Sequence, residues 1–195
     1  MNNFKYYIIK FLTNETTLGA AALIGFVVFA ASVNADWTVE QVEDIKVATL
    51  HGSVNAGDDN VPQADHYHIN SSGGLVTVGW TISEKLQKLN KPVTFNKAYS
   101  IAALIAMETK AGPVGDNPTL GFHWTYSLDG KDHGDLSEMI NTRYVKAIAD
   151  RIPMRTYTKI MAQMDRLWGT DMAKSMVFYD LEELKVYTVL NGKIQ

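Results

Sequence analysis

The most informative absence in this sequence is cysteine, which occurs nowhere in its 195 residues. Thiol catalysis, disulfide bridges and zinc sites built on thiolates are therefore excluded. An excess of basic residues is also absent, because 18 Lys and Arg stand against 21 Asp and Glu, for a net charge of −3. Binding to a phosphate backbone needs a basic surface, so no nucleic acid is expected as a partner.

Several catalytic motifs are missing as well. Neither a Walker A sequence nor a dinucleotide-binding glycine pattern occurs. Serine, histidine and aspartate are all present, but no nucleophile elbow of the form G-x-S-x-G accompanies them, so a serine hydrolase is not predicted. No internal repeat or low-complexity tract is found, and 46% hydrophobic with 20% charged residues is the composition of a folded protein.

What the sequence does contain is one long apolar run without a charge, LGAAALIGFVVFAASV, from Leu18 to Val33. Extended over residues 16–35, the run reaches the roughly 20 residues that a membrane-spanning helix needs. The small residues that end at Ala35, just before Asp36, equally fit the cleavage site of a secretory signal peptide. Residues 1–35 are therefore expected to be either a signal peptide or a single transmembrane anchor.

The charges that flank this run predict its orientation. Lys5 and Lys10 precede it, whereas acidic residues follow it from Asp36 onward, so the N-terminus is expected in the cytoplasm. Residues 36–195 are then extracytoplasmic, in the periplasm or secreted, and a retained run would anchor them in the membrane through residues 16–35. Their length suits one folded domain.

Hydrophobic periodicity over residues 36–195 predicts an α+β fold that is mostly helical. A small β-hairpin is expected from His66 to Ile82, because residues alternate on both sides of the turn at Ser71–Gly74. Residues 119–131 are expected to be extended, and the tail from Asp180 to begin as a helix and finish as a strand. Helices are expected over 38–50, 83–91, 97–110, 137–152 and 154–168, with a shorter one from Thr170.

Glu108 is the strongest candidate for a catalytic residue. It is the only acid between Lys97 and Lys110, and it lies at the C-terminal end of a helix that is otherwise apolar. Apolar neighbours and the negative end of the helix dipole both disfavour an ionised carboxylate. A carboxyl group kept protonated is what a glycosidic general acid requires. The alternative is a solvated carboxylate that pairs with Lys110 or Lys97.

The segment ALIAMETKAG, which ends at Gly112, resembles the region around the catalytic glutamate of lysozyme-like peptidoglycan glycosidases. In lytic transglycosylases, goose-type lysozymes and glucosaminidases, an apolar helix ends in Glu followed by Ser or Thr, with Gly three residues later. Glu108, Thr109 and Gly112 match that frame, and the later sequence NPTLGFHW, residues 117–124, looks similar to the loop that leads into their small β-lobe with its Gly-aromatic pair. The resemblance implies peptidoglycan as the substrate, Glu108 as the general acid, and substrate contacts from Trp124, Tyr126 and Tyr144.

His66 and His68 support a different hypothesis. They lie two residues apart in an expected strand, so both imidazoles leave the same face, which is a spacing that metal sites use. Acidic residues and histidines in the ranges 58–65 and 123–135 supply further candidate ligands. This pattern predicts an exported metal-binding module that holds zinc or a similar divalent ion, whereas the glycosidase hypothesis needs no cofactor.

The sequence thus predicts an exported or membrane-anchored envelope protein, with peptidoglycan glycosidase as its most specific function. The alternative is a non-enzymatic assembly protein of an envelope complex, a secretion system or a virion, whose helices between residues 137 and 178 bind partner proteins. A groove that unites Glu108 with Trp124 and Tyr126 would favour the enzyme. Convergence of His66 and His68 with a third ligand would favour the metal module.

Overall fold

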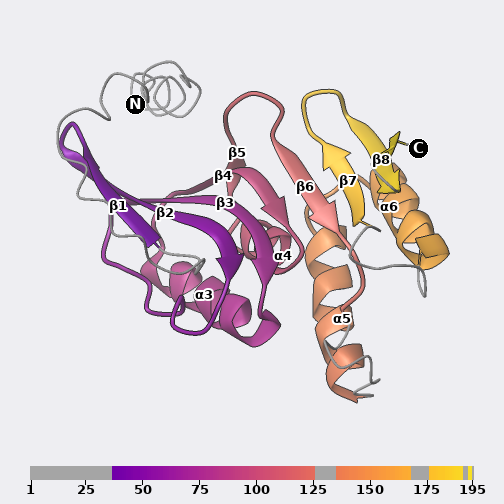
Figure 1. Ribbon diagram of the computed structural model, residues 1–195, viewed down its shortest axis with the longest axis horizontal. Helices are drawn as coiled ribbons and strands as arrows, with labels where there is room; N and C mark the ends of the chain where they lie inside the picture. Colours follow the sequence, from indigo (N-terminus) through magenta and orange to yellow (C-terminus); the bar gives the residue numbers. More distant parts are fainter. Residues whose placement is uncertain (1–36, 126–134, 168–175, 191–192, 195) are drawn as a thin grey trace.

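The computed structural model describes residues 37–125, 135–167, 176–190 and 193–194. Its centre is a mixed β-sheet whose main path runs β1-β2-β3-β4-β6-β7-β8-β9, with the two-residue strand β5 (Gly112–Pro113) beside β4 (Figure 1). Helix and strand are equally represented, at 36% each. The prediction of a mostly helical fold with one small hairpin is therefore wrong. None of the helices in the described ranges has the length and apolar character of a membrane span, and residues 1–35 lie outside those ranges.

The described chain begins with an antiparallel hairpin, β1 (Trp37–Val42) and β2 (Ile45–Val54). The helix expected over residues 38–50 is therefore wrong. Its apolar positions match helical spacing, but they are β-branched residues, which favour a pleated strand. The two-residue turn between the strands is made possible by Glu43, which adopts a positive φ of 53°.

The middle of the chain forms two consecutive strand–helix–strand units. Strand β3 (His66–Gly74) is followed by α3 (Val76–Leu89) and β4 (Val93–Tyr99), and β4 is followed by α4 (Ile101–Glu108) and β6 (Thr119–Phe122). The strand β4 pairs in parallel with both β3 and β6, and β3 pairs in parallel with β2. Because these strands are parallel, β3, β4 and β6 end at the same edge of the sheet.

Two expectations in this region are corrected by the parallel pairing. Residues 76–82 are the first half of α3 and not the second strand of a hairpin, because adjacent parallel strands need a long crossover. Residues 97–99 belong to β4, so the helix expected over 97–110 begins only at Ile101. Gly79, on the buried side of α3, lies so close to Ile101 that any larger side chain would collide with it.

The C-terminal part supplies two helices and a second set of antiparallel strands. The helices α5 (Asp135–Ala149) and α6 (Met154–Leu167) confirm the periodicity read from the sequence. Strand β7 (Met176–Asp180) pairs antiparallel with β6, and β8 (Lys185–Leu190) and β9 (Lys193–Ile194) complete the sheet.

The helix expected to begin at Asp180 is absent from the described structure. Asp180 Oδ1 instead accepts hydrogen bonds of 2.9 Å from the backbone N–H groups of Glu182 and Glu183, and this closes the turn between β7 and β8. The shorter helix expected from Thr170 begins outside the described residues.

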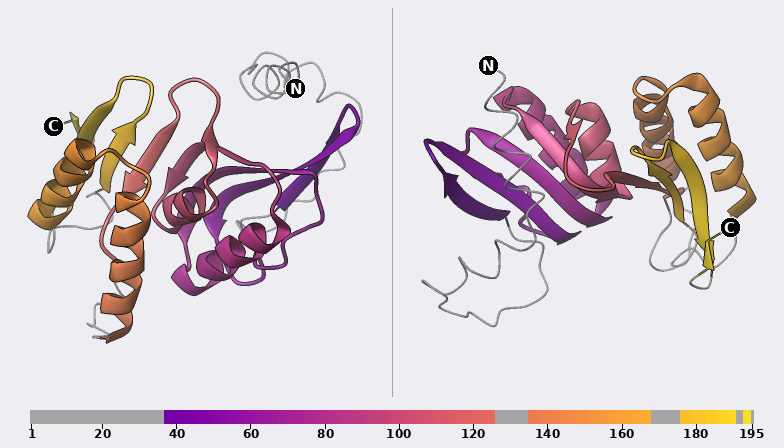
Figure 2. Two further views of the ribbon diagram at one scale, coloured as in Figure 1. Left: turned by 180° about the vertical axis from the view of Figure 1, so that it is seen from behind. Right: turned by 90° about the horizontal axis from the view of Figure 1, so that it is seen from above.

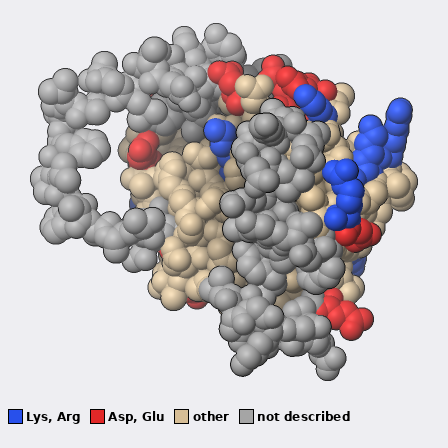
Figure 3. Space-filling model, turned by 45° about the vertical axis from the view of Figure 1, so that its right-hand side comes forward, with Lys and Arg blue, Asp and Glu red and all other residues tan. Residues whose placement is uncertain are grey.

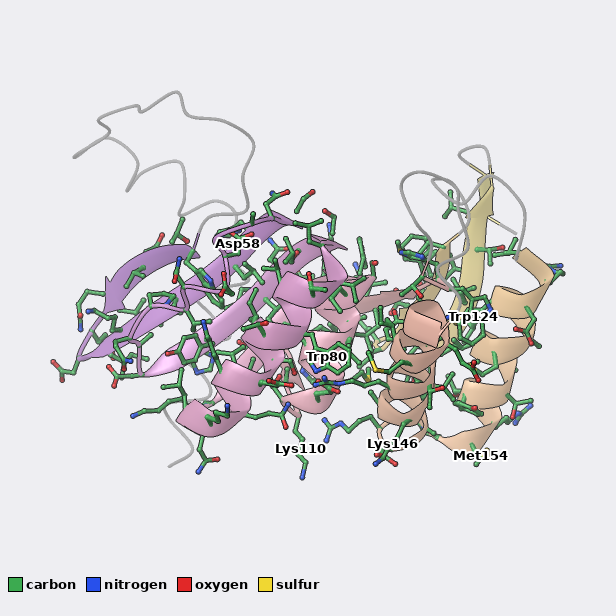
Figure 4. All side chains as sticks on the ribbon, turned by 90° about the horizontal axis from the view of Figure 1, so that it is seen from below. Asp58, Trp80, Lys110, Trp124, Lys146 and Met154 are labelled. Carbon is green, nitrogen blue, oxygen red and sulfur yellow. The ribbon has the colours of Figure 1, made fainter. Side chains whose placement is uncertain are left out.

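The four helices lie along one side of the sheet, in the order α3, α4, α5 and α6 (Figures 2 and 4). The helix α4 is central, and all seven of its residues from Ile101 to Met107 are buried, as its uniformly apolar sequence predicts. At the outer end, α6 buries Ile160, Met164 and Leu167 and exposes basic residues on its other side. Figure 3 shows Lys and Arg side chains in a row at one margin of the molecule.

Candidate active site

The parallel strands bring three segments together at one edge of the sheet. Gly73 and Gly74 end β3, Ser100 follows β4, and His123 follows β6. The register pairs β4 with each of the other two strands, so the three segments are neighbours. The carboxyl ends of parallel strands are where sheets of this kind bind their ligands.

Ser100 is the single residue between β4 and α4, and its backbone is strained. Its φ is 54° and its ψ is −128°, a conformation that residues with a side chain rarely adopt. Strain of this sort costs of order 1–3 kcal/mol and concentrates at functional sites. A sharp strand-to-helix turn projects its side chain away from the backbone, as in a nucleophile elbow.

The side chain of Ser100 contacts the imidazole of His123. A serine at this position ordinarily caps the helix through its hydroxyl, but Ser100 makes no such capping bond. Its Oγ lies 2.7 Å from His123 Nε2 instead. Both residues are half-buried.

The hydrogen bond at the other ring nitrogen defines the tautomer of His123. Its Nδ1 lies 2.7 Å from the backbone carbonyl oxygen of Trp124. A carbonyl oxygen can only accept, so Nδ1 carries the proton and donates it. In the neutral ring Nε2 is then the acceptor, and the hydroxyl of Ser100 donates to it.

Burial keeps His123 neutral at physiological pH. Desolvation lowers the pKa of its imidazole below the ordinary 6.5, and the hydrogen bond to the Trp124 carbonyl raises this pKa by a smaller amount. A neutral imidazole whose acceptor nitrogen receives a hydrogen bond from a hydroxyl is the arrangement that removes a proton from a nucleophile.

The N-terminal end of α4 adds hydrogen-bond donors beside Ser100. The N–H groups of Ala103 and Leu104 bond to the carbonyl oxygen of Ser100, at 3.0 and 3.4 Å. Ile101, the first residue of α4, has no acceptor within the helix for its own N–H, and the positive end of the helix dipole lies there. These are the properties of a site that stabilises an oxyanion.

Gly73 lies next to the backbone N–H of Ile101 and has no side chain there. It is buried with a φ of 85°, and a Cβ atom added to it would lie 2.6 Å from the Cβ of Ser100 and 3.1 Å from the backbone nitrogen of Ile101. Only a glycine permits this close approach of β3 to the start of α4. Gly73, which the sequence placed in a hairpin turn, therefore lies against the start of α4, whereas Gly74 lies against Val54 on β2.

Glu108, at the opposite end of α4, lies in an ion pair. Arg143 on α5 donates from Nε to Oε1 at 2.5 Å and from Nη2 to Oε2 at 2.7 Å, and the Ser83 hydroxyl donates to Oε2 at 2.6 Å. The Arg143 guanidinium also lies 4.0 Å from the centre of the Trp80 ring. Figure 4 shows Trp80 where α3, α4 and α5 meet, and Lys110 pointing away.

This geometry gives Glu108 the surroundings of a structural carboxylate. Its side chain is 14% exposed and that of Arg143 is 21% exposed. Both carboxylate oxygens accept hydrogen bonds, and the partner is Arg143 rather than the lysines considered from sequence. Its role as a general acid stays a prediction.

The aromatic residues expected to bind substrate have separate surroundings. Trp124 is half-buried and its Nε1 donates to Asp165 on α6 at 3.1 Å, whereas Glu108 is bonded to α3 and α5. Tyr144 is only 4% exposed, and its hydroxyl points to the carbonyl oxygens of Ser100 and Gly121. Tyr126 lies outside the described residues.

His66 and His68 leave the same face of β3, as their spacing suggested, and converge on one threonine. Thr94 Oγ1 lies 2.9 Å from His66 Nε2 and 3.0 Å from His68 Nδ1. Burial, followed by the neighbouring His66 and His51, lowers the pKa of His68 to about 4. Within the described ranges no three His, Asp or Glu side chains are grouped to hold a metal. Zinc binding stays a prediction.

Sequence reasoning missed Ser100, and considered His123 only as a further metal ligand, because it required the G-x-S-x-G pattern of a serine nucleophile. That pattern belongs to one family of nucleophile elbows, whereas the physical requirement is a strand, a sharp turn at the nucleophile and a helix. The signal was present as an alternating stretch VTFNKAY, a single serine, and the small apolar residues IAALIA. His123 carries no comparable local signal.

Comparison with known proteins identifies no family model that matches the chain and no characterised protein that is similar to it in sequence. The functional assignment therefore has to rest on the geometry of the site.

Proposed function

We propose that this protein is a serine hydrolase in which Ser100 is the nucleophile and His123 is the general base. The observation that carries the proposal is the 2.7 Å contact between Ser100 Oγ and His123 Nε2, made by a serine with a strained backbone at a strand-to-helix turn. The defined tautomer of His123 and the donor at the start of α4 support the same reaction.

The reaction is acyl transfer from an ester or an amide. Ser100 Oγ attacks the carbonyl carbon while His123 Nε2 takes the hydroxyl proton, and the negative charge that develops on the carbonyl oxygen is stabilised by the N–H of Ile101. The protonated imidazole then gives the proton to the leaving group as the carbon–leaving-group bond breaks. A water molecule, activated by the same Nε2, releases the acyl group from Ser100.

The compartment in which the enzyme works is a separate proposal. It rests on the apolar run and the flanking charges of residues 1–35, which predict an extracytoplasmic hydrolase of the cell envelope. Ser100 chemistry applies to envelope peptides and esters, but not to the glycosidic bonds of peptidoglycan, whose cleavage needs a carboxyl group.

Labelling with a fluorophosphonate tests the nucleophile directly. This probe reacts with an activated serine hydroxyl, so the wild-type protein should be modified and peptide mapping should place the adduct on Ser100. Ser100→Ala should abolish labelling, whereas Ser72→Ala, which removes an exposed hydroxyl on β3, should leave it unchanged. Wild-type protein that stays unlabelled, or equal labelling of Ser100→Ala, would contradict the proposal.

The pH dependence of labelling tests the base. His123 must be neutral to take the proton, and its pKa lies below 6.5, so the labelling rate should be full at neutral pH and fall in acid with a midpoint below 6.5. The rate should be measured with the fluorophosphonate between about pH 4 and 8. A midpoint at or above 6.5 would show that another group is the base.

A further inference from the structure

One hydroxyl group on α5 contacts both of the segments that carry the pair of Ser100 and His123, called the dyad below. The hydroxyl of Tyr144 donates to the carbonyl oxygens of Ser100, at 3.2 Å, and Gly121, at 3.4 Å. The same Gly121 carbonyl accepts the backbone N–H of Ser100 at 2.8 Å, and Gly121 lies two residues before His123. The ring of Tyr144 packs against Phe122, with 6.0 Å between the ring centres.

The preceding turn of α5 holds the other side of the His123 segment. Asn141 Oδ1 accepts hydrogen bonds from the backbone N–H of Thr125, at 3.1 Å, and from its hydroxyl, at 2.6 Å. Thr125 follows Trp124, whose carbonyl oxygen orients the His123 ring. Asn141 and Tyr144 are three residues apart, so they lie on the same side of α5.

Arg143 attaches α5 to the rest of the helix layer. Its bidentate bond to Glu108 and its contact with Trp80 tie α5 to α4 and α3. The helix that contacts the dyad is therefore held from the opposite end of α4, and its position is defined independently of the dyad.

We propose that Tyr144 and Asn141 are positioning residues of the hydrolase, which hold the Ser100 carbonyl and the His123 segment so that Oγ and Nε2 stay in contact. The inference rests on the proposed function. Neither side chain reaches the reacting atoms, since Tyr144 is buried beneath the turn and Asn141 bonds Thr125. Tyr144 is thereby given a role different from the substrate contact that sequence resemblance implied.

Tyr144→Phe removes only the hydroxyl and keeps the ring in the core. We expect kcat for a p-nitrophenyl ester to fall about 10- to 100-fold with KM changed less than about twofold, because a misplacement of the dyad affects the chemical step and not ground-state binding. Tyr67→Phe is the matched control. Tyr67 is also buried and its hydroxyl donates to the Pro62 carbonyl at 2.8 Å, away from the dyad, so kcat should stay at the wild-type level.

Asn141 provides a second variant pair. Asn141→Ala removes the acceptor of both Thr125 bonds, and kcat should fall as in Tyr144→Phe. Asn141→Asp keeps an acceptor oxygen at the same place and should restore kcat to within about threefold of wild type. Circular dichroism and thermal unfolding establish that each variant is folded.

The outcomes separate this inference from the proposed function. If the wild-type protein and Ser100→Ala turn over the ester equally, the hydrolase itself is overturned, and the positioning roles with it. If Ser100→Ala is inactive while folded Tyr144→Phe and Asn141→Ala keep wild-type kcat, only the positioning roles are overturned. If Tyr144→Phe does not fold, the Asn141 pair decides, and equal kcat of its Ala and Asp variants would contradict the inference.

Discussion

The two ends of α4 carry the two residues considered as catalytic, Glu108 and Ser100, and the two ends differ in what surrounds them. At the C-terminal end, Glu108 has both carboxylate oxygens occupied by Arg143 and Ser83. At the N-terminal end, Ser100 has a strained backbone, an imidazole at 2.7 Å and an adjacent N–H without an acceptor in the helix. Glu108 is conspicuous in the sequence and Ser100 is not, so the candidate nucleophile is identified by its local geometry rather than by an unusual residue type.

The helix dipole explains why the two ends suit different roles. Its positive N-terminal end favours the negative charge that develops during attack on a carbonyl group. Its negative C-terminal end disfavours a carboxylate, and the guanidinium of Arg143 offsets that effect at Glu108. The C-terminal end is thus stabilised by pairing, whereas the first N–H of the helix, that of Ile101, has no acceptor within the helix.

The largest expected effect comes from comparing separate substitutions of Ser100 and Glu108, at the two ends of α4, in one assay. Ser100→Ala should lower hydrolysis of a p-nitrophenyl ester by at least about 10³-fold, since removing a catalytic nucleophile has effects of that size. Glu108→Gln should stay within about threefold of wild type, because it pairs away from the reacting atoms. Release of muropeptides from peptidoglycan by the wild type but not by Glu108→Gln would reverse this comparison and establish the glycosidase.

Part of the loss of stability in acid should arise away from α4, at His68. Its pKa is about 4 when folded and 6.5 when unfolded, so the unfolded chain binds more protons between these values and stability is lost as the pH falls from 6.5 to 4. The loss should be about 3 kcal/mol, measured by urea unfolding across that range.

His68→Gln should remove the part of this pH dependence that comes from His68, while leaving the acid decrease in fluorophosphonate labelling, which belongs to His123. An unchanged pH dependence of unfolding in His68→Gln would show that another group causes it. If His68→Gln removed both the acid loss of stability and the acid decrease in labelling, activity would fall in acid because the protein unfolds. The labelling profile would then no longer report on His123.

Breaking the ion pair should affect stability and not chemistry. Glu108→Gln should lower the free energy of unfolding by about 2 kcal/mol, because it removes the closer carboxylate from the partly buried Arg143 guanidinium and leaves only the 3.5 Å contact with Glu84. A double-mutant cycle with Arg143→Met should give a coupling of about 1–3 kcal/mol. A coupling near zero would mean that the pair is solvated and adds nothing to the fold.

The smallest expected effect is a gain in stability from relieving the strain at Ser100. Ser100→Gly should be inactive and more stable than wild type by about 1 kcal/mol, because glycine adopts a positive φ without the clash of a Cβ atom. Ser100→Ala, which keeps the Cβ atom, is the control and should not show the gain. Equal stability of both variants in urea unfolding would mean that the turn stores no strain.

Helices whose formation depends mainly on their own residues were predictable from the sequence. The periodicity of α5 and α6 identifies both helices, and the uniformly apolar residues of α4 place it at the centre of the core. Segments whose secondary structure depends on how neighbouring strands pair were not predictable from the sequence. Residues 76–82 alternate as a strand would, yet they form a helix because β3 and β4 pair in parallel and need a crossover between them.

By itself, the sequence determined the absence of thiol chemistry, the apolar N-terminal run with its flanking charges, and the central place of the helix that ends at Glu108. Only the tertiary structure decided that Arg143 pairs with Glu108, and that Ser100 meets an imidazole 23 residues further along the chain. The reason is physical: the parallel register of β3, β4 and β6 brings their carboxyl ends to one edge, and no local pattern in the sequence encodes that register.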